Sequence, residues 1–266
     1  MKLLNLISGT QFKRLFLAAA VAASCATSAF ALPVFTFNPA SLCATGTTCS
    51  SITADNIIIS DFAQVTMTSA TTFSESGYLQ IAGFQLAGAP VMPAGFNTAY
   101  NLYIPFSGTG HLTSANTNPT TGSTEGVFDT LTYQFIGNSG PGTGTASFDS
   151  GTVLGTGSLI GGFVNTSRST STPGFAPAAN VDFNFTPLVP SFFAAPVPFY
   201  NLGFSSFVNT TTQITLTETG FNVNAGGGSL NFASSEVPEP ATVALLGLGL
   251  LGVAASRRKS AKSKNA

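Results

Sequence analysis

The sequence contains no tryptophan, one histidine and few charged residues. Only 7% of its 266 residues are charged, and the formal net charge is −1. Between residues 32 and 236, Arg168 is the single cation and there is no lysine. One cation cannot neutralise a run of phosphates, so we expect no nucleic-acid binding. The lack of lysine excludes a Walker A motif and Schiff-base chemistry from this segment.

Residues 32–236 are instead acidic, with nine carboxylates against one cation and therefore a net charge of −8. Catalytic parts are scarce. His111 is the only histidine, there is no Gly-x-Ser-x-Gly motif, and a lone histidine in a Gly/Thr segment is typical of a solvated loop residue. We expect no enzyme. A secreted glycoside hydrolase stays open as an alternative, with Glu75, Glu125 and Glu218 as candidates and Glu75 with Glu218 as the pair.

No metal site or cofactor is predicted either. Calcium is the metal that an extracellular β-domain most often binds. Asp55, Asn56 and Asp61 lie close together in the sequence, as do Glu125 and Asp129, but neither group follows a known calcium-binding pattern. Solvated acids are the favoured interpretation of both groups.

The N-terminus has the three parts of a secretory signal peptide. A basic stretch ends at Lys13 and Arg14, an apolar segment follows at 15–26, and the small residues Ala29 and Ala31 flank Phe30. We expect signal peptidase to cleave after Ala31.

Cleavage there would remove Cys25 and leave the pair Cys43 and Cys49. In an oxidising compartment, a disulfide between these two is the favoured interpretation. A metal site is less favoured because no second pair of ligands lies nearby, and a bridge between molecules stays open.

The C-terminus carries a second processing segment, in which Val237, Pro238, Glu239 and Pro240 precede an apolar run at 241–255. As a helix this run would span about 22 Å, which is short of the roughly 30 Å hydrocarbon core of a bilayer. The basic cluster of Arg257, Arg258 and Lys259 follows and is expected to stay cytoplasmic, which places residues 32–236 outside the inner membrane.

This order of motif, short Gly/Leu-rich helix and basic tail resembles the PEP-CTERM sorting signal of Gram-negative bacteria that secrete exopolysaccharide. The resemblance implies that the protease exosortase removes the tail near Pro238–Pro240, after transient anchoring in the inner membrane. A generic C-terminal anchor is the alternative. We thus predict a signal peptide at 1–31, an extracellular body at 32–236 and a sorting segment at 237–266.

The body shows period-two apolar patterns bounded by Gly, Pro, Asn and Asp, which are typical of strands. About ten strands in 205 residues indicate an all-β fold, an antiparallel β-sandwich or jelly-roll-like domain, and two small sandwiches stay open. Turn-rich stretches at 107–124, 137–144, 167–179 and 226–229 are expected to separate strands. The expected strands are 34–37, 56–68, 77–86, 100–106, 127–135, 181–185, 200–208, 213–217 and 221–223.

The expected core is phenylalanine, and the expected surface is hydroxyl, because 55 of these 205 residues are Ser or Thr. The segments 35–39, 54–62, 73–78, 198–201 and 224–232 are similar to flocculation-associated PEP-CTERM proteins. That resemblance implies a secreted, non-enzymatic matrix protein that helps cells aggregate with exopolysaccharide in flocs or biofilm. A specific glycan-binding module is the alternative, with Tyr78, Tyr100, Tyr103 or Tyr133 exposed to hold the sugar.

Overall fold

The computed structural model describes residues 32–114, 122–141, 151–168 and 175–234. The chain divides into two compact units, Met1–Leu32 and Pro33–Ala266, and the description below concerns the second. The predicted signal helix at 1–31 and the predicted membrane helix at 241–255 lie outside the described residues. Within the described ranges, no helix is long and apolar enough to cross a membrane.

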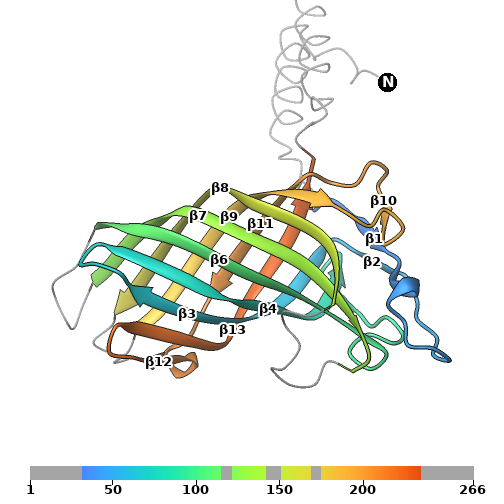
Figure 1. The fold of residues 1–266 in the computed structure, drawn as a ribbon, viewed down its shortest axis with the longest axis horizontal. Helices are drawn as coiled ribbons and strands as arrows, with labels where there is room; N and C mark the ends of the chain where they lie inside the picture. Colours follow the sequence, from blue (N-terminus) through green and yellow to red (C-terminus); the bar gives the residue numbers. More distant parts are fainter. Residues whose placement is uncertain (1–31, 115–121, 142–150, 169–174, 235–266) are drawn as a thin grey trace, which may run out of the picture. The chain divides into compact units, whose positions relative to one another are not determined.

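The described residues form an all-β fold built around one closed antiparallel barrel of eight strands (Figure 1). Neighbouring strands pair in the order β11-β9-β8-β7-β6-β4-β3-β13, and pairing of β11 with β13 closes the ring. The barrel strands are β3 (Asn56–Met67), β4 (Thr72–Leu86), β6 (Tyr100–Ser114), β7 (Gly122–Ser139), β8 (Thr152–Arg168), β9 (Phe175–Pro187), β11 (Leu202–Val208) and β13 (Gly220–Ala233).

The remaining elements are short. Strand β5 (Ala89–Val91) extends the hairpin from β4, and β12 (Ile214–Leu216) pairs with the first part of β13. Strands β1 (Phe35–Phe37), β2 (Ile52–Ala54) and β10 (Phe193–Ala195) form a separate sheet in the order β10-β1-β2. Two single-turn 3-10 helices, η1 (Pro39–Ser41) and η3 (Thr211–Gln213), complete the described elements.

The all-β prediction is confirmed, but the predicted sandwich or jelly roll is wrong, because a single sheet closes on itself. In both architectures one face of each strand packs inward and the other meets solvent, so period-two alternation cannot separate them. Register shifts occur in β3–β4, β6–β7, β7–β8, β8–β9 and β13–β3. Such bulges bend strands and increase their twist, which helps a sheet to close.

The strands are also longer than their apolar patterns predicted. Strand β6 continues to Ser114, β9 begins at Phe175, and the Gly226–Ser229 stretch, which was expected to be a turn, lies inside β13. Strand β8 was not predicted at all, because its glycines and hydroxyls are typical of turns. One of them, Gly157, lies so close to the Tyr133 ring and to the main chain of Asn184 that a side chain there would collide with both.

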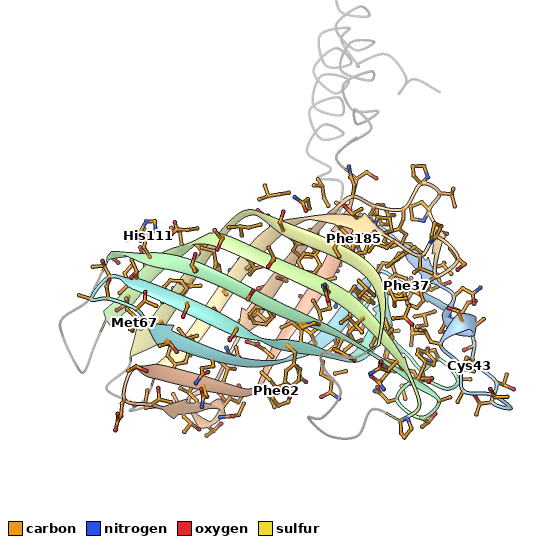
Figure 2. All side chains as sticks on the ribbon, in the orientation of Figure 1. Phe37, Cys43, Phe62, Met67, His111 and Phe185 are labelled. Atoms are coloured by element: carbon orange, nitrogen blue, oxygen red, sulfur yellow. A yellow bond between two sulfur atoms is a disulfide. The ribbon has the colours of Figure 1, made fainter. Side chains whose placement is uncertain are left out.

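The three-stranded sheet lies at one end of the barrel, and phenylalanine side chains fill that end (Figures 1 and 2). Phe37 of β1 is fully buried, and its ring centroid lies 4.9 Å from that of Phe192 and 5.8 Å from that of Phe135 on β7. The expected phenylalanine core is confirmed. Other rings within 6.3 Å of Phe37 are those of Phe35, Phe84, Phe193, Phe199 and Phe232.

Candidate functional site

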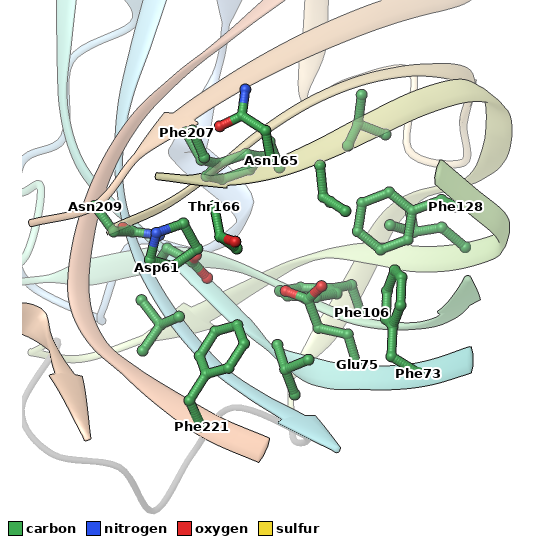
Figure 3. A pocket seen from close by; sticks show the side chains of 18 of the residues that line it. Asp61, Phe73, Glu75, Phe106, Phe128, Asn165, Thr166, Phe207, Asn209 and Phe221 are labelled. Carbon is green, nitrogen blue, oxygen red and sulfur yellow. The ribbon is translucent and has the colours of Figure 1, made fainter. Parts of the chain in front are cut away.

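The barrel interior is hollow away from the phenylalanine-filled end and encloses a cavity of about 660 Å³ (Figure 3). The lining is mostly apolar, with a few polar side chains from β3, β4, β7, β8, β11 and the segment after it. The polar lining residues are Asp61, Glu75, Thr124, Asn165, Thr166, Ser205, Asn209 and Thr211.

Asp61 occupies the inward face of β3, where its neighbours Ile59 and Ala63 are also buried. Only 5% of Asp61 is exposed, and its Oδ1 atom has no hydrogen-bond partner. Burial raises the pKa of Asp61 to about 7, although a hydrogen bond from the side chain of Asn209 opposes the shift. The Oδ1 atom of Asn209 is buried without a partner as well.

Glu75 projects into the same cavity from β4, where it lies opposite Val65 of β3. Burial raises its pKa to about 8, and the charge of Asp61 adds to the rise. None of the described residues that line the cavity is Lys, Arg or His. The two acids therefore share an apolar chamber in which no described cation compensates them, and near neutral pH they hold protons that exposed carboxyls would lose.

The structure does not unite the suggested hydrolase pair. Glu75 lines the cavity, whereas Glu218 lies in the exposed turn between β12 and β13 and Glu125 is exposed on β7. The second acid of the cavity is Asp61, which the sequence analysis treated as a solvated acid. The inward position of Asp61 could have been predicted, because Asp61 occurs on the apolar face of the alternating segment 57–65.

The residues considered for calcium do not converge. The Asp55 carboxylate accepts a hydrogen bond from the Ala87 amide (2.7 Å), Asn56 donates to Gln85 (2.8 Å), and Asp61 faces the cavity. Asp129 pairs with His111 on the outer surface, with 2.8 Å between Oδ1 and Nδ1. His111 was expected in a solvated loop; it is solvated, but it lies on strand β6 and has a partner.

The expectation of four exposed tyrosines is wrong for three of them. Tyr100, Tyr103 and Tyr133 are at most 7% exposed. The Tyr133 hydroxyl donates to the main-chain oxygen of Asn184 (2.8 Å), and that of Tyr103 accepts from Asn138 (3.0 Å). Tyr78 is half-buried and stacks on Phe62.

The predicted disulfide is confirmed. Cys43 and Cys49 are bonded in the segment between η1 and β2, with 6.1 Å between their Cα atoms. The disulfide holds this loop next to Gly95, beside the three-stranded sheet and away from the cavity lining.

The sorting segment is the remaining candidate site, and a comparison with protein families decides its identity. Residues 236–259 match the PEP-CTERM protein-sorting motif. The chain carries a PEP-CTERM sorting signal. The match spans Val237–Pro240 and the basic residues Arg257, Arg258 and Lys259, all of which lie outside the described residues.

A PEP-CTERM signal implies processing by exosortase and marks an exported protein of the cell surface or the extracellular space. The signal peptide and its cleavage site at Ala29 and Ala31 stay predictions, since they lie outside the described residues. Comparisons with curated proteins and with solved structures give no match. The resemblance of the body to flocculation-associated proteins therefore receives no support from them.

Proposed function

We propose that this PEP-CTERM protein is a non-enzymatic matrix protein that promotes flocculation and biofilm aggregation by binding exopolysaccharide. A Gram-negative host would export the chain, anchor it transiently in its inner membrane and release it through an exosortase-like protease. The observation that carries the proposal is a row of uncharged polar residues on the outer face of the barrel.

This polar row runs across seven neighbouring strands, each member lying opposite the next in the strand register. Most members are exposed. In order from β13 to β9, the row consists of Asn222, Gln64, Ser76, Ser107, Thr132, Ser158 and Asn184.

A second, shorter line of hydroxyls runs beside it. Thr66, Ser74, Thr109 and Thr130 are paired across β3, β4, β6 and β7, and the hydroxyls of Thr109 and Thr130 are 2.8 Å apart. Hydroxyl and amide groups both donate and accept hydrogen bonds, as sugar hydroxyls do. Such a surface can exchange its bound water for a polysaccharide strand without burying any charge.

The non-enzymatic part of the proposal is supported by how the reactive side chains are distributed. His111 lies outside the barrel and pairs with Asp129, while Asp61 and Glu75 lie inside it. Glu75 and Glu218, the pair that the sequence suggested for a hydrolase, do not share a site.

Specific binding of one glycan is the second candidate. The buried tyrosines weaken the form suggested by the sequence, because only Tyr78 of the four retains partial exposure. The polar row would then be the binding face. Saturable calorimetric binding of a single defined oligosaccharide would favour this candidate over general adhesion to the matrix.

The test is a deletion of the gene followed by complementation, with floc size and settling rate as the measurements. Wild-type protein should restore aggregation, while a variant that combines Gln64→Ala, Ser107→Ala and Thr132→Val should fail although it is secreted in equal amount. Thr53→Val, on the small sheet, is the control and should restore aggregation fully. Unchanged aggregation after deletion would overturn the proposal.

A further inference from the structure

We infer that the barrel interior is a binding site for a small amphipathic amine, an apolar molecule that carries one ammonium group. This inference concerns the cavity alone and does not depend on the outer polar row or on aggregation. It follows from the size of the cavity, the chemistry of its walls and the hydrogen-bonding atoms left without partners.

The cavity has the size of a ligand site. Pockets that hold drug-sized molecules measure roughly 300–1,000 Å³ and are lined mainly by apolar side chains with a few well-placed polar groups. The volume of about 660 Å³ lies inside that range. Phe73, Phe128 and Leu131 contribute apolar wall, and the Phe73 and Phe128 rings meet edge to face at 5.7 Å.

Two acceptor atoms of the cavity lack hydrogen-bond donors. Oδ1 of Asp61 and Oδ1 of Asn209 are both acceptors, both buried and both without a hydrogen-bond partner. Figure 3 shows these two side chains together on one side of the chamber, with Glu75 also facing it. Buried polar atoms in native proteins are normally paired, so these acceptors mark the place in the cavity where a bound molecule can supply donors.

An ammonium group supplies what these atoms lack. It carries three N–H donors and a positive charge, whereas the lining offers two carboxyls and no described cation. A carboxylate ligand would instead bring a third acidic group into the chamber and would supply no donor. The apolar walls require the rest of the ligand to be hydrocarbon or aromatic, and aromatic rings of the lining, such as that of Phe221, also attract cations.

Binding should release protons. At pH 7 the raised pKa values, about 7 for Asp61 and about 8 for Glu75, mean that Asp61 is about half protonated and Glu75 largely protonated in the empty cavity. An ammonium ion that pairs with one carboxyl favours its ionised form, and the displaced proton passes to the buffer. The number of protons released therefore measures ion pairing inside the cavity. Non-specific adsorption of an apolar molecule to the protein surface would release no protons.

The experiment is isothermal titration calorimetry with the exported protein, purified without detergent from the producing cells. The probes are n-decylamine, n-decanol and n-decanoic acid, which share one chain and differ in the head group. At pH 7 we expect saturable binding of one decylamine, with decanol and decanoic acid roughly tenfold weaker or more. Equal affinity for decanol or decanoic acid, or no saturable binding of the amine, would overturn the inference.

Two isosteric variants and one control locate the site. Asp61→Asn and Glu75→Gln replace the two carboxyls of the cavity by amides of nearly the same size, so both should fold. Together they should weaken decylamine binding at least tenfold and abolish the proton release, which is measured from the heat in buffers of different ionisation enthalpy. Glu218→Gln removes an exposed acid and should change neither quantity. Wild-type affinity in the double variant would refute the assignment.

Discussion

Glu75 lies opposite Val65, four residues along β3 from Asp61, so two acids on adjacent strands face one cavity. Burial is the main reason for the raised pKa of Glu75, and the charge of Asp61 makes its ionisation still less favourable. Neither group has a described cation beside it in the lining. The pair makes folding stability depend on pH in an unusual direction.

Stability should fall as the pH rises from about 4 to about 8. In the unfolded chain these acids ionise near 3.8 and 4.5, but in the folded barrel their pKa values are about 7 and about 8. The folded state therefore binds more protons over that interval, and raising the pH favours unfolding until both groups ionise in the fold. One pKa unit corresponds to about 1.4 kcal/mol, so Asp61 alone accounts for on the order of 4 kcal/mol.

Urea unfolding at several pH values checks this prediction. A variant that carries both Asp61→Asn and Glu75→Gln should lose most of the decline between pH 4 and pH 8. Glu218→Gln should keep the wild-type profile, since Glu218 is exposed. A double variant with the same pH slope as the wild type would show that these carboxyls titrate normally.

Phe37→Ala should be among the most destabilising single changes in the small sheet. Phe37 is fully buried and contacts rings of both the sheet and the barrel, so its loss leaves a cavity that the surrounding rings cannot fill. The expected cost is about 3–5 kcal/mol in the free energy of unfolding, measured with denaturant. Phe163→Ala is the matched control: Phe163 is 51% exposed, and its loss should cost far less.

Gly157→Ala should destabilise the barrel wall by about 1–3 kcal/mol. A methyl group at this position would collide with the Tyr133 ring and with the main-chain oxygen of Asn184, which accepts the hydrogen bond of the Tyr133 hydroxyl. Gly161→Ala, on the same strand, meets open space and serves as the control. Thermal melts of the two variants should differ clearly, and equal melting temperatures would contradict the close approach.

Replacing both Cys43 and Cys49 by serine should cost about 2 kcal/mol, because the loop that the disulfide closes is short. The cavity should be unaffected, since neither cysteine lines it. The unfolding free energy measures the first effect. Decylamine affinity tests whether the cavity is unaffected, and it should stay at the wild-type value. A large loss of affinity would mean that the loop supports the cavity from a distance.

Much of the sheet could be predicted from local pattern. Strand β3 alternates apolar and polar residues over most of its length, and its predicted range, 56–68, is nearly that observed, Asn56–Met67. Strand β8 could not be predicted in this way, because Gly155 and Gly157 are required by the neighbouring rings of Phe185 and Tyr133 rather than by the strand's own pattern. Closure of the barrel could not be predicted either, because it depends on long-range pairing between β11 and β13, such as Leu202 with Ala233, and not on any local pattern.

The site could have been predicted more fully than it was. The segment Leu131–Phe135 alternates cleanly, which places Tyr133 on the same inward face as its apolar neighbours, in conflict with an exposed sugar-binding role. The same logic applies to Asp61 between Ile59 and Ala63. What the sequence could not supply is the empty volume, because a cavity depends on how eight strands curve around one another.

The pairing of β11 with β13 has a consequence for how copies of an exported protein meet one another. A sheet with open edges offers unpaired main-chain groups to its neighbours, and crowded copies can then polymerise strand by strand. In the described part of this chain the long strands all have partners on both sides. The edge strands, such as β12, β5 and β2, have only three residues each. Closure of the barrel therefore leaves neighbouring copies no long strand edge to which they could add.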